Sequence, residues 1–300
     1  MRKLFCLIAA IACIATPDLI AQTKTAAKKP VPAPAAPAKV KGCISKAPYI
    51  GAIILDADTG KSLFEERADI PGYPASTLKL MTLLVIQEKI DAGDVKLTDK
   101  VSVSVKAAKT GGSQVYLDPR ETFNVEDMLY ALMIQSANDA AVALTEHVAG
   151  STEAFVALMN KKAEKLGMEN TRFASVHGLP PSADQKHDVS TARDMSILCR
   201  ELCKHPAIFA YTSASYRQLR ADTKPFDMRT HNPFLKENIA GCDGFKTGYT
   251  AVAGWSIAVT CKRNNRRVIV MVLGSETRQM RDANAKELLN KAFTLIQDPA

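Results

Sequence analysis

Long hydrophobic runs are almost missing from this sequence of 300 residues. One apolar run, at 4–15, lies near the N-terminus and is shorter than the roughly 20 residues that a membrane-spanning helix needs. No other segment is long and apolar enough to cross a bilayer. We therefore expect no membrane-spanning helix in the rest of the chain.

An excess of charge of one sign is also missing from most of the chain. The formal net charge is +8, but residues 1–42 hold seven basic residues and one acidic residue, which leaves +2 on the other 258 residues. Proteins that bind nucleic acids usually carry a basic stripe or patch. A nearly neutral body argues against such a surface, and we expect no nucleic-acid partner.

Metal-binding motifs are absent as well. No C-x-x-C or H-x-x-x-H spacing occurs, and the five histidines are scattered along the chain. Spaced cysteines and histidines are the usual sequence sign of a metal site, so we predict no metal and no cofactor. The sequence also lacks G-x-S-x-G, which disfavours a hydrolase with a Ser-His-Asp triad.

Five cysteines lie beyond the N-terminal apolar run, and an odd number leaves at least one free thiol or an intermolecular bond: Cys43, Cys199, Cys203, Cys242 and Cys261. Cys242 and Cys261 flank an expected β-hairpin, and a disulfide between them is permitted in an oxidising compartment. The sequence slightly favours two reduced cysteines at these positions, because cysteine is also a common small buried residue.

The N-terminus has the pattern of a secretory signal. Arg2 and Lys3 precede the apolar run, and Ala21 offers a small residue for cleavage, so residues 1–21 are predicted to be a signal peptide. An uncleaved N-terminal anchor remains the alternative. Residues 22–42 are rich in Ala, Pro and Lys and predict an extended linker. We expect export to the periplasm or the extracellular cell envelope, with one catalytic domain over 43–300.

The domain has strand patterns at both ends and helix patterns between them. Strands are expected at 49–55, 61–66, 244–249, 254–261 and 267–273, and helices at 76–92, 124–136, 139–149, 151–167, 190–205 and 281–296. This order predicts an α/β (α+β) fold with an antiparallel sheet of about five strands flanked by helices. The sheet lobe would comprise 43–73 and 240–300, and the helical lobe 74–205. We expect the active site in the cleft between the lobes.

Ser76-Thr77-Leu78-Lys79 is the first of three short motifs that carry chemistry. Residues three apart on a helix share one face, so the Lys79 amine can reach the Ser76 hydroxyl. A serine hydroxyl needs an adjacent base, and a lysine serves only if its surroundings lower its pKa. An isolated S-x-x-K is more often a helix cap and a solvated lysine. Here the lysine has apolar neighbours, and no other serine has Lys at the third position after it.

The second and third motifs are weak on their own. Ser136-Ala137-Asn138 lies between two expected helices, where the Ser136 hydroxyl could relay a proton and the Asn138 carboxamide could hold a substrate, or Asn138 could simply cap a helix. Lys246-Thr247-Gly248 lies on an expected strand. Its cation and hydroxyl suit a carboxylate, and its glycine allows a peptide to approach the strand edge. A second K-T-G, at 109–111, is discounted because no sustained strand follows it.

Together the motifs occur in the order S-x-x-K, S-x-N, K-T-G, separated by 60 and 110 positions. This order resembles the active-site serine penicillin-binding proteins and β-lactamases. Over about 45–297 the chain is similar to the low-molecular-mass D-Ala-D-Ala carboxypeptidases, in the hairpin at 53–69 and the segments 74–79, 178–179, 190–194 and 243–250. The resemblance implies a β-lactamase/transpeptidase-like fold.

The resemblance also implies roles. Ser76 would attack the carbonyl of the penultimate D-alanine of a peptidoglycan stem peptide (acyl-D-Ala-D-Ala) and form an acyl-enzyme, and Lys79 would take its proton. Ser136 and Asn138 would assist proton transfer and hold the substrate, and Lys246 would add charge. The backbone N–H groups of Ser76 and Tyr249 would form an oxyanion hole. Arg281 would bind the terminal carboxylate near Thr247, beside Gly248. β-Lactam antibiotics would be inhibitors.

The sequence departs from the family at a few positions. Ala137 replaces a glycine, and His231 lies where some relatives carry a second arginine. Many relatives continue into a β-rich domain and an amphipathic membrane-anchoring helix, and we expect no C-terminal membrane anchor here. The closest alternative function is a D,D-endopeptidase that cleaves peptidoglycan cross-links. A β-lactamase is less favoured because no E-x-x-L-N-like segment occurs, and a catalytically inactive scaffold is disfavoured by the intact motifs.

Overall fold

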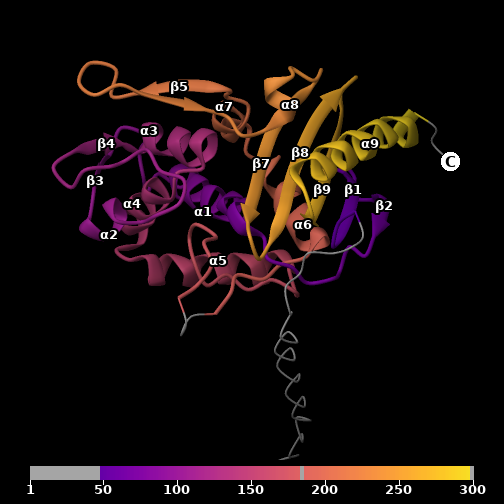
Figure 1. Cartoon of the computed structure of the whole chain (residues 1–300), viewed down its shortest axis with the longest axis horizontal. Helices are drawn as coiled ribbons and strands as arrows, with labels where there is room; N and C mark the ends of the chain where they lie inside the picture. The colour runs from indigo at the N-terminus through magenta and orange to yellow at the C-terminus, as the bar shows by residue number, and fades with distance from the viewer. Residues whose placement is uncertain (1–47, 183–185, 298–300) are drawn as a thin grey trace, which may run out of the picture. The chain divides into compact units, whose positions relative to one another are not determined.

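The computed structural model describes residues 48–182 and 186–297 (Figure 1). The predicted signal peptide, the linker at 22–42 and Cys43 lie outside the described residues. Within them, no helix is both long enough and apolar enough to span a membrane.

A five-stranded antiparallel sheet joins the two ends of the described chain. Its order is β2-β1-β9-β8-β7, and its strands are β1 (Gly51–Asp56), β2 (Ser62–Glu66), β7 (Cys242–Thr250), β8 (Gly254–Arg263) and β9 (Arg266–Ser275). β1 pairs with β9, so the N-terminal hairpin and the C-terminal meander form one sheet. This result confirms the predicted fold class and leaves β7 as an edge strand.

The sheet is covered on both faces, because successive side chains of a strand point to opposite faces and all six residues of β1 are buried. The helix α9 (Arg278–Gln297) packs on β8 and β9 (Figure 1), where Ala52, Ile54 and Val270 contribute to a core shared with Leu289. On the other face, Ile53 and Leu55 join the larger core that continues into the helices. The α6 helix (Ala192–Leu202) covers this second face and contacts β9 and β1.

The middle of the chain is mostly helical around one central helix. α1 (Lys79–Asp91) is buried at nine successive positions, from Lys79 to Gln87, and contacts α4 (Asn138–Ala149), α5 (Thr152–Leu166) and α6. A shorter helix, α3 (Val125–Tyr130), packs on α4, and a π turn η2 (Ala131–Gln135) connects α3 to α4. A helix buried on all sides holds its residues rigidly, so α1 is a fixed platform for any side chain at its start.

Helix ends follow local capping rules. The Ser151 hydroxyl accepts from the backbone N–H of Ala154 at the start of α5, and Thr191 accepts from Asp194 at the start of α6. The helix expected from position 190 therefore begins at Ala192, with Thr191 as its cap. The structure also contains short elements that the sequence patterns did not resolve: β3 (Lys100–Ser102), α2 (Val105–Ala108), β4 (Thr122–Asn124), η3 (Pro206–Ile208), α7 (Phe209–Thr212), β5 (Tyr216–Leu219), β6 (Phe226–Arg229) and α8 (Pro233–Lys236).

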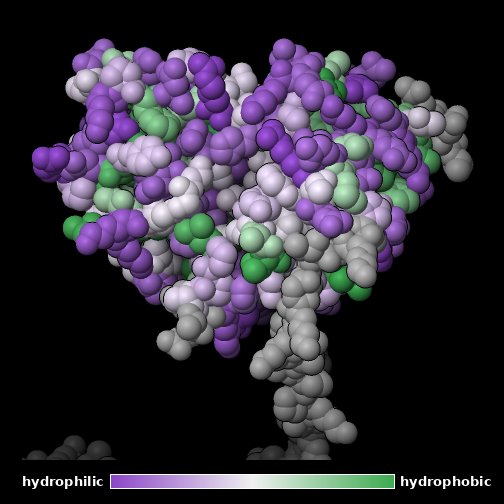
Figure 2. All heavy atoms as spheres, in the orientation of Figure 1, coloured by the Kyte–Doolittle hydropathy of each residue, from purple (hydrophilic) through white to green (hydrophobic). Residues whose placement is uncertain are grey.

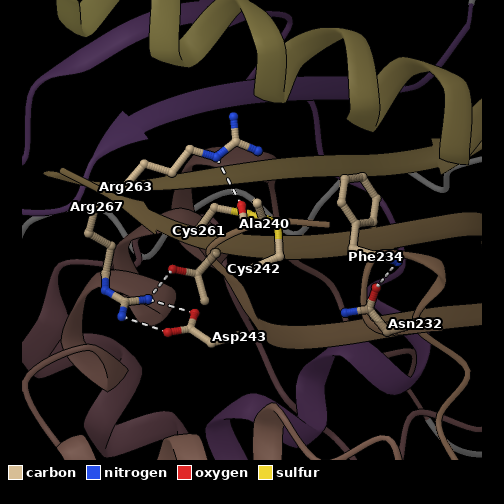
Figure 3. The surroundings of a disulfide bond; sticks show 9 residues. Asn232, Phe234, Ala240, Cys242, Asp243, Cys261, Arg263 and Arg267 are labelled. Carbon is tan, nitrogen blue, oxygen red and sulfur yellow. Dashed lines mark hydrogen bonds and ion pairs between the residues drawn. A yellow bond between two sulfur atoms is a disulfide. The ribbon is translucent and has the colours of Figure 1, made fainter. Parts of the chain in front are cut away.

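Cys242 and Cys261 form a disulfide, so the expectation of two reduced cysteines was wrong (Figure 3). The two residues are direct partners in the β7–β8 ladder, where their side chains face each other on one side of the sheet. Beside them, the Arg267 guanidinium forms two hydrogen bonds with the Asp243 carboxylate, at 2.8 and 2.7 Å. The disulfide and this ion pair fix the beginning of β7.

We predict that a C242A/C261A double variant loses about 3 kcal/mol of unfolding free energy, because a disulfide that closes a loop of this length restricts the unfolded chain. The two cysteines are 19 positions apart. Urea unfolding with and without dithiothreitol is the measurement. The reductant should destabilise the wild type and leave the double variant unchanged. Equal stability of the variant and the oxidised wild type would contradict the prediction.

Candidate active site

Ser76 lies in a tight turn directly before the central helix. The residues Ala75–Leu78 form a 3-10 turn, and α1 begins only at Lys79, so the expected α-helix from Ser76 starts three residues later than predicted. Ala75 has φ of +47°, an unusual value for a residue with a side chain. Two glycines make room for this turn. A Cβ on Gly178 would lie 2.2 Å from the Ala75 carbonyl oxygen, and one on Gly248 would lie 3.2 Å from the Ser76 nitrogen.

Lys79 is completely buried and reaches Ser76. Its Nζ lies 3.0 Å from Ser76 Oγ, 2.7 Å from Asn138 Oδ1 and 2.7 Å from the carbonyl oxygen of His177. Burial lowers the pKa of Lys79 well below its usual value, and the positive charge of Lys246 lowers it further. A neutral amine has two N–H groups and one lone pair. In Lys79 the two N–H groups can donate to Asn138 Oδ1 and to the His177 carbonyl, and the lone pair can then accept the proton of the Ser76 hydroxyl.

Ser136 lies in the connection between η2 and α4, and Asn138 is the first residue of α4. Ser136 adopts a left-handed conformation, with φ of +61°, which ends the π turn. Its Oγ is buried and has no hydrogen-bond partner within the described part of the chain. Asn138 is held from both ends, because its Nδ2 donates to the Gly111 carbonyl at 2.8 Å while its Oδ1 accepts from Lys79. A buried hydroxyl without a partner beside a held carboxamide is suited to meet a ligand.

The edge strand β7 forms the opposite side of the site. Lys246 and Thr247 are buried, whereas Tyr249 is about half exposed and stacks on Trp255 with ring centroids 3.9 Å apart. Burial, together with the nearby Arg281, lowers the pKa of Lys246 to about 7. Gly248 packs against the Ser76 turn, and this contact brings the strand edge close to the serine.

Arg281 projects from the first turns of α9. Only 2% of its side chain is exposed, and its Nε donates to Asp282 Oδ1 at 2.7 Å. Its guanidinium carbon lies 5.6 Å from the centroid of the Trp255 ring. Burial lowers the pKa of Arg281, but the neighbouring Asp282 carboxylate opposes that shift, and the guanidinium stays charged.

These residues surround one cleft of about 390 Å³. Seven of the nine residues predicted for the site line it, namely Ser76, Ser136, Asn138, Thr247, Gly248, Tyr249 and Arg281. The other two, Lys79 and Lys246, are buried, and Lys79 reaches the cleft through Ser76. The structure therefore brings together nine residues that span more than 200 positions of sequence.

Other residues of the cleft carried no signal in the motifs. Gly112 and Ser113 line it just after the discounted K-T-G at 109–111, which lies in a loop and not on a strand. Lys236, Trp255 and Arg278 line it from α8, β8 and α9. Their approach depends on how these elements pack. Of the remaining lining residues, Gly178, Leu179 and Thr250 lie in segments that carried the family resemblance, and His231 had been noted as a departure from the family.

This fold, with a serine and a buried lysine at its cleft, defines the class of active-site serine penicillin-binding proteins. More narrowly, the chain belongs to the D-alanyl-D-alanine carboxypeptidase family, because residues 46–277 match the model of that family. The family assignment agrees with the resemblance seen in the sequence motifs.

Individual relatives support the assignment. The chain is 40% identical over 244 residues to the D-alanyl-D-alanine carboxypeptidase DacF of Bacillus subtilis, covering 81% of this chain and 61% of that protein. It is 35% identical to DacC of Escherichia coli, covering 93% and 67%. A crystal structure of penicillin-binding protein D2 from Listeria monocytogenes, in the ampicillin-bound form, has a TM-score of 0.73 and 30% identity, covering 82% and 97%. The chain thus spans three fifths to two thirds of the length of these curated relatives.

Two glycines with nearly equal backbone angles provide a test of the Ser76 turn. Gly178 has φ of +82° and touches Ala75, whereas Gly150 has φ of +79° and has nothing within 4 Å of an added Cβ. Both Gly178→Ala and Gly150→Ala should lose about 1 kcal/mol of stability or more from backbone strain. Only Gly178→Ala should slow labelling of Ser76 by fluorescent penicillin, by at least tenfold. Equal labelling rates in the two variants would show that the turn does not depend on Gly178.

The lowered pKa of Lys246 predicts a pH-dependent stability difference. Its pKa is about 7 in the folded protein and 10.5 as a model value, so the folded state binds fewer protons than the unfolded state between these values. The wild type should therefore lose stability as pH falls from about 10 to about 7, by up to about 1.4 kcal/mol per pH unit. Lys246→Met, which removes the buried cation, should show a smaller slope in urea unfolding across this range. If the unfolding free energies of the wild type and Lys246→Met change in parallel with pH, the pKa of Lys246 is not lowered by folding.

Proposed function

We propose that the chain is a serine-type D-Ala-D-Ala carboxypeptidase, which removes the terminal D-alanine from peptidoglycan stem pentapeptides through an acyl-enzyme on Ser76. The observation that carries the proposal is the 3.0 Å contact between Ser76 Oγ and the buried Nζ of Lys79. A serine becomes a nucleophile when an adjacent base takes its proton. The family assignment supplies the substrate class for this nucleophile.

In the acylation step, neutral Lys79 accepts the hydroxyl proton while Ser76 Oγ attacks the carbonyl carbon of the penultimate D-alanine. The carbonyl oxygen becomes an oxyanion, and we assign its hydrogen bonds to the backbone N–H groups of Ser76 and Tyr249. Support for this pairing comes from the contact of Gly248 with the Ser76 turn, since it holds the β7 backbone beside the Ser76 nitrogen. The substrate chain would lie along β7, whose outer edge pairs with no strand of the described residues.

Collapse of the tetrahedral intermediate requires a proton on the leaving amine. The unpartnered Ser136 Oγ lines the cleft and can pass a proton from the Lys79 ammonium to that amine. Asn138 would hold the acyl part of the substrate, and Lys246 would add positive charge. Thr247 and Arg281 would bind the free carboxylate of the departing D-alanine. Water, activated by the same lysine, would then hydrolyse the acyl-enzyme.

β-Lactam antibiotics would acylate the same serine and act as inhibitors. The Listeria monocytogenes relative has been crystallised in an ampicillin-bound form. Because peptidoglycan lies outside the cytoplasm, the proposal requires that the chain is exported to the periplasm or the extracellular cell envelope. The apolar N-terminal segment supports this location.

Release of D-alanine from an N-acylated pentapeptide ending in D-Ala-D-Ala is the direct test. Ser76→Ala should reduce release by at least 10³-fold, because no nucleophile remains, and should abolish covalent penicillin labelling with an unchanged circular dichroism spectrum. Ser102→Ala, at an exposed serine of β3, is the matched control and should retain full activity. Labelling that persists in Ser76→Ala would overturn the assignment. Faster cleavage of a cross-linked dimer than of the pentapeptide would instead favour a D,D-endopeptidase.

A further inference from the structure

Three side chains form a basic rim on the wall of the cleft: His231, Lys236 and Arg278. Lys236 is the last residue of α8, and Arg278 is the first residue of α9. Lys236 and Arg278 are exposed to solvent, and all three residues line the same cleft as Ser76. The proposed catalytic steps use none of them.

The rim holds more positive charge than its own carboxylates neutralise. Asp282 is shared, because its Oδ1 accepts from Arg281 Nε at 2.7 Å and its Oδ2 lies 3.8 Å from Arg278 Nε. Lys236 forms no ion pair with any residue of 48–182 or 186–297. The carboxylate next to it in sequence, Glu237, is bound to Lys286 at 2.6 Å. Two arginines and one lysine therefore face the cleft with one counter-charge.

His231 adds a polar group but no charge. Desolvation, together with the positive charges of Lys246 and Lys236, lowers the pKa of His231 to about 4. The imidazole is thus neutral near pH 7 and can donate or accept a hydrogen bond. Neutral His231 leaves Lys236 and Arg278 as the charged groups of the rim.

One carboxylate of a substrate cannot neutralise this surplus. In the proposed function, the terminal carboxylate binds Arg281 and Thr247. The terminal carboxylate neutralises one positive charge, and one more positive charge remains on the rim. Arg278 precedes Arg281 by three positions on the same helix, so the surplus charge lies on the side of the departing residue and not on the acyl side.

Resting on the proposed function, we propose that the basic rim binds a second anionic group, carried by the side chain of the departing residue. The cleft would then accept leaving groups larger than D-alanine and would favour those with an acidic side chain. Lys236 and Arg278 are specificity-determining residues in this view. Because both are exposed, their attraction for an anion is moderate and is screened by salt.

Two synthetic peptides that differ only in side-chain charge provide the test: acyl-D-Ala-D-Glu and acyl-D-Ala-D-Gln. The wild type should have a kcat/KM about five- to tenfold higher for the D-Glu peptide, as expected for two partly exposed ion pairs, and this ratio should fall at high salt. In the K236Q/R278Q double variant, the ratio should fall to about one. K291Q removes a charge from the same helix at a residue that packs on Phe64, and it should keep the wild-type ratio.

Turnover of acyl-D-Ala-D-Ala distinguishes the two proposals. If the wild type does not release D-alanine from it, the proposed function fails and the rim proposal fails with it. If D-alanine is released but the wild-type ratio is one, only the rim proposal is overturned. A ratio that stays at five to ten in K236Q/R278Q also overturns the rim proposal. In particular, if the double variant loses kcat/KM equally on all three peptides, the rim binds only the terminal carboxylate.

Discussion

The site depends on one buried amine that has no carboxylate bound to it in the described chain. Moving an ammonium group from water into a protein interior costs several kcal/mol, which favours its neutral form. Lys79 meets this condition because it begins a helix that is buried on all sides, and its hydrogen bonds go to Ser76, Asn138 and the His177 carbonyl. The helical part of the fold thus lowers the pKa of the amine beside the serine and favours its basic form.

Two buried aspartates fix the loops near this amine but form no ion pair with it. Asp139 accepts hydrogen bonds from the backbone of Val115 and Leu117, which fixes the loop that follows Gly112. Asp188 accepts from the backbone of Ala174 and Ser175, ahead of the His177 carbonyl. Burial raises the pKa of both carboxyl groups, and these hydrogen bonds counteract the rise. Each carboxylate accepts its hydrogen bonds from a loop, and neither forms an ion pair with Lys79.

One face of the protein shows no large apolar patch. Figure 2 shows a face that is mostly hydrophilic, with apolar residues in small separate groups. Within the cleft, cations are concentrated: buried Lys246 and Arg281 lie behind exposed Lys236 and Arg278. The chain as a whole has little net charge beyond its first 42 residues, so this concentration results from packing and not from composition. A positive cleft in a nearly neutral body attracts an anionic peptide without attracting polyanions broadly.

The sequence by itself determined the fold class, the family and the three motifs. Strand alternation and helix periodicity depend on residues close together in the chain, and the order of the motifs along the chain requires no knowledge of contacts. It also placed the nine candidate residues without fixing their geometry. Tertiary structure alone decided that Ser76 lies in a 3-10 turn, that Lys79 is fully buried, that Cys242 and Cys261 are bonded and that Lys236 and Arg278 reach the cleft. Burial, pKa and charge balance arise from contacts between segments far apart in sequence, and no local pattern encodes those contacts.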